Sequence, residues 1–134
     1  NMPAKNHIEK FARNVLGCDC PDEVFNVIEC DRGDPVADAY GVRISIGGRL
    51  LIYILETADI AVVEETLPRM LNAGKAERDD KKMNRFRAVV STDQVDTLEE
   101  AAKKVFDGFD QKDEKIHLHV LNKRDVAGIY AECP

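Results

Sequence analysis

Two cysteines separated by one residue form the motif in this sequence with the clearest chemical potential. Cys18 and Cys20 occur in the run Cys18-Asp19-Cys20-Pro21. Two thiols this close can form a strained and easily reduced disulfide, in which Cys20 attacks or is attacked and Cys18 resolves the mixed disulfide. We therefore treat Cys18 and Cys20 as candidate catalytic residues. The alternative is that both thiols are partly buried and serve only as small apolar side chains.

Cys20 is the thiol that we expect to be the most reactive of the four in the chain. Gly17 suits the end of one helix and Pro21 suits the first position of the next, which makes Cys20 an N-cap residue. The unpaired N–H groups at a helix N-terminus favour the thiolate form. Three neighbouring carboxylates oppose this effect: Asp19, Asp22 and Glu23.

A soft-metal site is the second possibility for the cysteines. The thiolates of Cys18, Cys20 and Cys30 could bind zinc or iron, with Cys133 as a distant fourth ligand. The spacing lacks the paired Cys-x₂-Cys motifs that mark zinc sites, and it also differs from the common ferredoxin spacings. Thiol chemistry, metal binding and simple packing therefore all stay open for these cysteines.

His117 and His119 form a second candidate site. Residues i and i+2 of a strand share one face with Cα atoms about 6.6 Å apart, so two imidazoles could bind one metal ion. The sequence offers no third ligand beside them, and we expect both rings to line a solvated or helix-covered face. The residues that alternate with them would face the core: Ile116, Leu118 and Val120.

The cysteines are expected to lie in a reducing compartment. Asn1 precedes Met2, so we interpret Asn1 as a tag remnant and Met2 as the first native residue. No signal peptide follows, because charged residues interrupt the first apolar stretch. We therefore expect a cytoplasmic protein in which stable structural disulfides are absent.

The elements before residue 56 must position the cysteine motif. An apolar stripe at helical spacing predicts a helix over 8–16, which Gly17 ends in the left-handed conformation. A short helix is expected to start at Pro21, although residues 25–30 could instead form a strand. Alternation predicts a half-exposed strand over 42–46, and Gly47-Gly48 predicts a two-residue hairpin turn. The apolar run 50–55 predicts a central strand buried on both faces.

The rest of the chain alternates helices with strands. We expect a helix over 59–73, kinked or split at Pro68 and stopped at Gly74. The mixed-charge run 75–85 predicts a solvated loop or a frayed helix end. A strand over 86–91, a helix that begins with the capping box Thr97–Glu100 and a strand over 116–120 follow. Residues 125–134 have no clear pattern.

This order of elements predicts the α/β class. Strands alternating with helices from Arg49 onward imply right-handed crossovers between parallel strands, and the hairpin adds an antiparallel strand. We expect one globular domain over residues 1–134, with a mixed sheet of four or five strands. An α+β two-layer sandwich is the alternative.

Composition narrows the function classes. The 134 residues include 19 Lys and Arg against 25 Asp and Glu, and the net charge of −6 argues against binding to nucleic acid or to an anionic membrane surface. The chain is then either a thiol or metal protein, or a non-enzymatic interaction or regulatory domain whose cysteines only pack. The partner in that second case would be an unidentified protein or small molecule. It would lie at two strand-end loops: Glu56-Thr57 and Ser91-Thr92-Asp93.

Overall fold

The computed structural model describes residues 7–134 and contains a five-stranded mixed sheet in the strand order β1-β2-β3-β4-β5. Neighbouring strands are antiparallel from β1 to β3 and parallel from β3 to β5. The α/β class is confirmed, and the two-layer alternative is wrong. The assignment of Asn1 and Met2 as tag remnant and native start falls outside the described residues. The strands are β1 (Ile28–Arg32), β2 (Val42–Ile46), β3 (Leu50–Glu56), β4 (Arg85–Thr92) and β5 (Ile116–Asn122).

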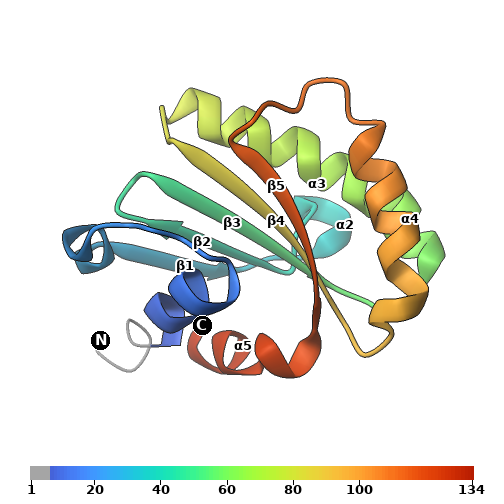
Figure 1. The fold of residues 1–134 in the computed structure, drawn as a ribbon, viewed down its shortest axis with the longest axis horizontal. Coiled ribbons are helices and arrows are strands. Elements are labelled where there is room, and N and C mark those ends of the chain that lie inside the picture. Colours follow the sequence, from blue (N-terminus) through green and yellow to red (C-terminus); the bar gives the residue numbers. More distant parts are fainter. Residues whose placement is uncertain (1–6) are drawn as a thin grey trace.

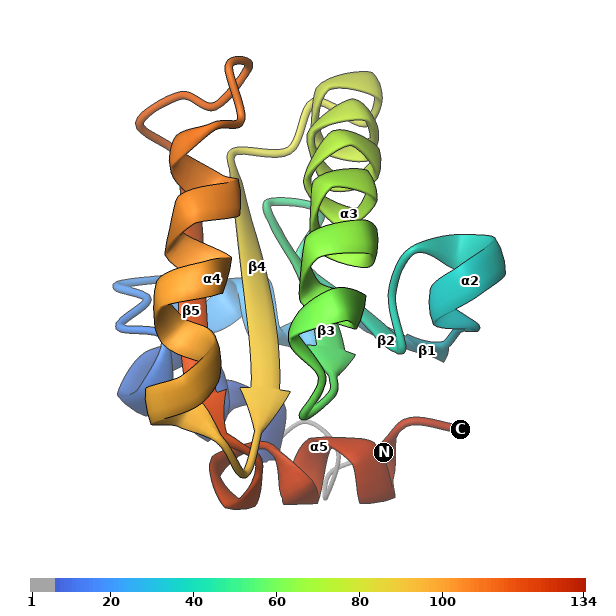
Figure 2. The ribbon, with the colours of Figure 1, turned by 90° about the vertical axis from the view of Figure 1, so that its right-hand side faces the viewer.

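Helices cover both faces of this sheet (Figures 1 and 2). One face packs against α3 (Ile60–Asp80) and α4 (Val95–Asp107). The other face packs against the N-terminal helix and α5 (Ala127–Glu132). The N-terminal helix comprises residues 7–10 and a π-helical continuation, η1 (Phe11–Val15). Three shorter elements complete the described chain: η2 (Asp22–Asn26), α2 (Pro35–Asp38) and η3 (Lys123–Asp125).

The central strand β3 divides its side chains between two cores. Leu50, Ile52 and Ile54 pack with the N-terminal helix and α5. Leu51, Tyr53 and Leu55 pack with α3 and α4. The six-residue apolar run is therefore buried on both faces, as its composition predicts, because each face of the sheet carries its own layer of helices.

Strand β2 is buried along its whole length, so the prediction of a half-exposed strand is wrong. Its polar residues Arg43 and Ser45 are 8% and 7% exposed. The reason is that β2 lies between β1 and β3 and is covered on both faces. Arg43 is accommodated by ion pairs to Glu77 of α3 and to Asp31 and Glu29 of β1.

The β2–β3 hairpin contains one residue more than the glycine pair predicts. Ile46 pairs with Leu50, so Gly47, Gly48 and Arg49 all belong to the loop. Both glycines have positive φ, 61° and 65°, which confirms the conformational reason for glycine there.

Helix α3 continues past two expected breaks. It runs unbroken through Pro68 and Gly74, because residues on both sides of the proline, including Leu67 and Met70, are fully buried against the sheet. Gly74 is needed for space: a Cβ atom there would overlap the ring of Phe86. The mixed-charge residues 75–80 are consequently helical, and one of them, Arg78, is only 7% exposed.

Two further boundaries differ from the sequence-based expectation. Helix α4 begins at Val95 with Gln94 as its N-cap, so Thr97 lies inside the first turn and no Thr97 capping box forms. The unassigned C-terminal residues contain α5, which packs on the sheet through Ile129. Across residues 7–134, no helix combines the length and apolar character needed to cross a membrane.

Candidate functional site

The Cys18–Cys20 pair lies in the loop that leaves the N-terminal helix. Gly17 ends that helix with φ 73°, which confirms its left-handed role. The backbone N–H of Cys18 then donates to the carbonyl of Ala12 at 2.8 Å. Cys18 and Cys20 form a disulfide with their Cα atoms 5.4 Å apart. The structure therefore brings together the two residues that the sequence singles out as a thiol pair.

Cys20 does not cap a helix, so the N-cap argument for its reactivity is wrong. The following helix, η2, is a five-residue 3₁₀ helix whose N-cap is Pro21, and no side chain caps it. Pro21 has ψ 153°, an extended conformation that delays the helix start by one residue. Cys20 thus precedes the cap and receives no N–H donors from it.

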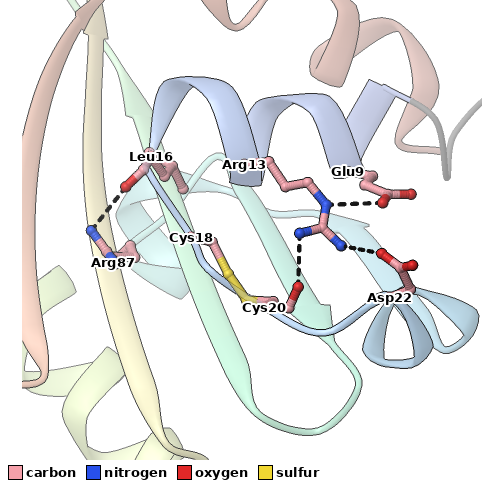
Figure 3. The surroundings of a disulfide bond; sticks show 7 residues. All are labelled: Glu9, Arg13, Leu16, Cys18, Cys20, Asp22 and Arg87. Carbon is pink, nitrogen blue, oxygen red and sulfur yellow. Dashed lines mark hydrogen bonds and ion pairs between the residues drawn. A yellow bond between two sulfur atoms is a disulfide. The ribbon is translucent and has the colours of Figure 1, made fainter.

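Arg13 holds the disulfide loop against the N-terminal helix (Figure 3). Its Nη1 donates to the carbonyl oxygen of Cys20 at 2.7 Å. Its Nε and Nη2 bond the carboxylates of Glu9 and Asp22 at 3.0 and 2.8 Å. Its guanidinium also lies 4.7 Å from the centre of the Phe25 ring. These contacts fix the backbone of the loop from the Cys20 side.

Arg87 of β4 holds the other end of the same loop. Its Nη1 donates to the carbonyl of Leu16 at 3.2 Å (Figure 3) and lies 3.0 Å from Nε2 of His119. His119 and its neighbour His117 lie on β5, on the same face as Arg87, because the β4–β5 register pairs Arg87 with His117. The prediction that the two histidines share one strand face is confirmed. His117 is the strand partner of Arg87, and His119 contacts the Arg87 guanidinium.

A cavity of about 500 Å³ separates the disulfide loop from the sheet, and we call it the basic cavity. Cys18 and Cys20 form part of its wall. Its polar lining contains three guanidinium groups and one carboxylate. The polar residues are Asp19, Arg49, Asn84, Arg85, Arg87 and His117.

The positive charge of the basic cavity comes from arginine rather than histidine. Burial, together with the charge of Arg87, lowers the pKa of His119 to about 4. Burial and the same guanidinium also lower the pKa of His117. Both rings are therefore neutral at neutral pH. Burial and the charge of Arg85 lower the pKa of Arg87 from its ordinary high value, which still leaves its guanidinium charged.

The other two cysteines form a second disulfide, which corrects the expectation that structural disulfides are absent. Cys30 of β1 is bonded to Cys133, 103 residues later, with Cα atoms 5.3 Å apart. Cys30 is therefore not joined with Cys18 and Cys20 in one ligand set for zinc or iron. Within residues 7–134, no group of three or more His, Cys, Asp or Glu side chains converges as metal ligands would.

A second hollow lies at the carboxyl edge of the parallel strands. It measures about 680 Å³, and we call it the strand-end hollow. Glu56 and Asp93 from the two loops named as candidate ligand positions contribute to it. The remaining lining comes from β1, the end of β5, η3 and α5: Arg32, Asn122, Lys123, Arg124, Ala127 and Tyr130.

Arg85 and Arg87 were missed as site residues by sequence reasoning. The available signal was incomplete, because the predicted strand over 86–91 contains Arg87 but begins one residue after Arg85. In the structure β4 begins at Arg85, which places two basic side chains at i and i+2 beside His117 and His119 of β5. Both pairs point to one face once the strands are adjacent and parallel. No protein-family model, no curated protein and no solved structure matches this chain.

Proposed function

We propose that this protein, acting as a single domain, carries out thiol–disulfide exchange through Cys18 and Cys20. The observation that supports this proposal best is the position of the disulfide in the wall of the basic cavity, where a small molecule can reach it. Both cysteines are only partly buried. Accessible disulfides are the ones that take part in exchange, whereas structural disulfides resist reduction.

The exchange runs through a mixed disulfide. In the reducing direction, an external thiolate attacks the Cys20 sulfur, a new sulfur–sulfur bond forms there, and the Cys18 sulfur leaves with the electron pair. A second external thiolate then attacks the external sulfur of the mixed disulfide and releases the Cys20 thiolate. Two external thiolates become one disulfide, and the protein gains two electrons and, from solvent, two protons. In the oxidising direction, the Cys20 thiolate attacks an external disulfide and releases one external thiolate. The Cys18 thiolate then attacks the Cys20 sulfur of the mixed disulfide, which re-forms the Cys18–Cys20 bond and releases the second external thiolate.

The surroundings support this chemistry in two ways. Arg85 and Arg87 supply positive charge to the cavity in which the leaving thiolate develops, and positive charge favours a thiolate. Arg13 and Arg87 hold both ends of the loop, so the two sulfurs stay close after the bond has opened. Return of the disulfide is then an intramolecular step, which positioning accelerates.

A binding domain without thiol chemistry is the second candidate. The strand-end hollow favours it, because the carboxyl ends of parallel strands are where α/β proteins gather small ligands. In that case the Cys18–Cys20 disulfide would only brace the loop.

Disulfide mapping under graded reduction tests the proposal. The chain is equilibrated with increasing dithiothreitol, alkylated and mapped by mass spectrometry. Cys18–Cys20 should open first and re-form on removal of the reductant. The protein should also accelerate reduction of bis(2-hydroxyethyl) disulfide by dithiothreitol, and Cys18→Ser/Cys20→Ser should abolish this activity. Cys30→Ser/Cys133→Ser is the matched control and should keep it. Equal activity of both double variants would favour the binding domain.

A further inference from the structure

We infer that the substrate of the Cys18–Cys20 site is a small carboxylate-bearing thiol or disulfide, whose carboxylate binds Arg85 and Arg87 in the basic cavity. This inference rests on the proposed thiol–disulfide exchange and adds the chemical class of the substrate.

The two partly buried arginines of the basic cavity, Arg85 and Arg87, differ from the buried arginines elsewhere in having no acidic partner. Arg43 is paired with the carboxylate of Glu77, and Arg78 with that of Asp113 at 2.6 Å. Among the described residues, Arg49, Arg85 and Arg87 form no ion pair with a carboxylate. A partly buried guanidinium without a counter-ion gains most from an anion, because desolvation of a lone charge is costly.

Two buried nitrogen atoms beside the cavity also lack partners. Nε of Arg87 and Nδ1 of His117 are enclosed and form no hydrogen bond. Buried polar atoms are nearly always bonded, and a bound ion or ligand is one explanation of an exception. Two other exceptions, Ser91 Oγ and Tyr130 Oη, belong to residues outside this lining. Arg87 and His117 are paired across the β4–β5 ladder, so their two unbonded nitrogen atoms belong to neighbouring residues that line the cavity.

The spacing of the cations suits a carboxylate rather than a large polyanion. Arg85 and Arg87 are at i and i+2 on β4 and point to the same face, about 6.6 Å apart at their Cα atoms. A guanidinium fork can bind both oxygens of one carboxylate. Because His117 is neutral, the three arginines and Asp19 leave a net charge of about +2 in the lining, against −6 for the whole chain.

The size of the basic cavity fits a small molecule. Ligand pockets in proteins typically enclose about 300–1,000 Å³, and this one measures about 500 Å³. A molecule seated there reaches the arginines on the sheet side and the sulfur atoms on the loop side. Binding the carboxylate would hold the reacting sulfur beside the disulfide, which converts a random encounter into a positioned attack.

Three small thiols that differ in charge test this inference on the full chain. We would measure the rate at which Cys18–Cys20 is opened by 3-mercaptopropionate, 2-mercaptoethanol and cysteamine, each normalised to its own rate with a small reference disulfide. The anionic thiol should open the protein disulfide about tenfold faster than the neutral one, since a focused cationic site raises the local concentration of an anion. The cationic thiol should be slowest, and added salt should reduce the differences.

Arg85→Gln is the variant that localises the effect. No hydrogen bond or ion pair involves the Arg85 side chain among the described residues, so Arg85→Gln breaks no polar contact of the fold. The variant should lose most of the preference for 3-mercaptopropionate, measured as the ratio of its rate to the rate with 2-mercaptoethanol. Both absolute rates should fall, because Arg85 also favours the leaving thiolate. Arg124→Gln, in the strand-end hollow, removes the same charge elsewhere and should keep the preference.

The possible outcomes separate the inference from the proposed function. If all three thiols open the disulfide at equal normalised rates, the site exchanges disulfides but does not select an anion, and the inference is overturned. A preference that survives in Arg85→Gln, or that disappears equally in Arg124→Gln, also overturns the assigned location. If none of the thiols opens Cys18–Cys20, the proposed function itself fails.

Discussion

Arg87 Nη1 lies 3.2 Å from the carbonyl oxygen of Leu16 and 3.0 Å from Nε2 of His119. One guanidinium on β4 therefore joins the end of the N-terminal helix to β5, the last parallel strand. The disulfide loop begins directly after this contact. The start of the disulfide loop is thus held by Arg87, which lies 71 positions after Leu16 in the chain.

His119 should make stability depend on pH through this contact. Because burial and then the charge of Arg87 lower its pKa from about 6.5 to about 4, the folded state favours the neutral ring. The stabilisation is complete above about pH 6.5 and is lost as the pH falls towards 4, because the unfolded chain takes up the proton first. Between pH 7 and pH 5 the free energy of unfolding should drop by about 1–2 kcal/mol from this residue.

Urea unfolding of His119→Gln at the two pH values checks this prediction. The glutamine amide oxygen can still accept from Arg87 but does not titrate in this range. The variant should show a smaller loss between pH 7 and pH 5 than the unaltered protein. His7→Gln is the control, since the His7 side chain is 50% exposed, and it should keep the full loss. An unchanged pH dependence in His119→Gln would contradict the prediction.

Arg43 and Glu77 form a second buried polar contact, between β2 and α3. Their side chains are 9% and 13% exposed, and Tyr53 also donates to Glu77, at 2.5 Å. Arg43→Met should lower the free energy of unfolding by about 3–5 kcal/mol, because it leaves the Glu77 carboxylate buried without its main partner. Arg43→Met/Glu77→Leu should be less destabilised than the single variant. A double variant that loses the sum of both single effects would contradict this coupling.

The same contact should also set the acid stability of the protein. Burial alone would raise the pKa of Glu77, but hydrogen bonds from Arg43, Lys81 and Tyr53 outweigh it and lower the pKa to about 2. The stabilisation is fully present above the unfolded pKa of about 4.5 and is lost as the pH falls towards 2. Arg43→Met should therefore flatten the loss of stability in that window, measured by unfolding at pH 5 and pH 3.

Local sequence patterns predict those parts of the fold that depend on near neighbours. The glycines at 47 and 48 predict a backbone conformation, namely a turn with positive φ. The apolar run of β3 predicts burial on both faces, and the spacing of His117 and His119 predicts that they share one face of a strand. Gly74 shows where this reasoning stops. Its role is to leave space for the ring of Phe86, which comes from another element. In the sequence, a glycine with this role cannot be distinguished from a glycine that ends a helix.

The candidate site was predictable only in its cysteines. Cys18 and Cys20 are close in sequence, so their pairing is a local matter. The basic cavity forms only because β4 lies beneath the disulfide loop. No local pattern around Arg85 and Arg87 predicts that they lie close to residues 16–20. The Cys30–Cys133 disulfide is missed for two reasons. The expected reducing compartment argues against any structural disulfide, and the sheet edge and the C-terminal segment meet only after folding.

Cys30 and Cys133 should stabilise the fold without taking part in exchange. Their disulfide joins β1 to the residue after α5, and it closes a long loop that restricts the unfolded chain. Cys30→Ser/Cys133→Ser should lower the free energy of unfolding by about 2–5 kcal/mol in non-reducing buffer. The unaltered protein and the variant should converge once both disulfides of the former are reduced. A difference of the same size in strongly reducing buffer would show that the cysteines stabilise by packing instead.

The hairpin glycines should differ in their cost of substitution, although both have positive φ. A methyl group on Gly48 meets nothing within 4 Å, so Gly48→Ala should cost only the conformational penalty of about 1 kcal/mol. A methyl group on Gly47 would lie 2.6 Å from Cβ of Val24 and 2.8 Å from its carbonyl oxygen, which adds an overpacking cost of about 1–3 kcal/mol. Urea unfolding measures both values. Equal losses would mean that Val24 moves aside freely, and slowed opening of Cys18–Cys20 in folded Gly48→Ala would show that the turn belongs to the site.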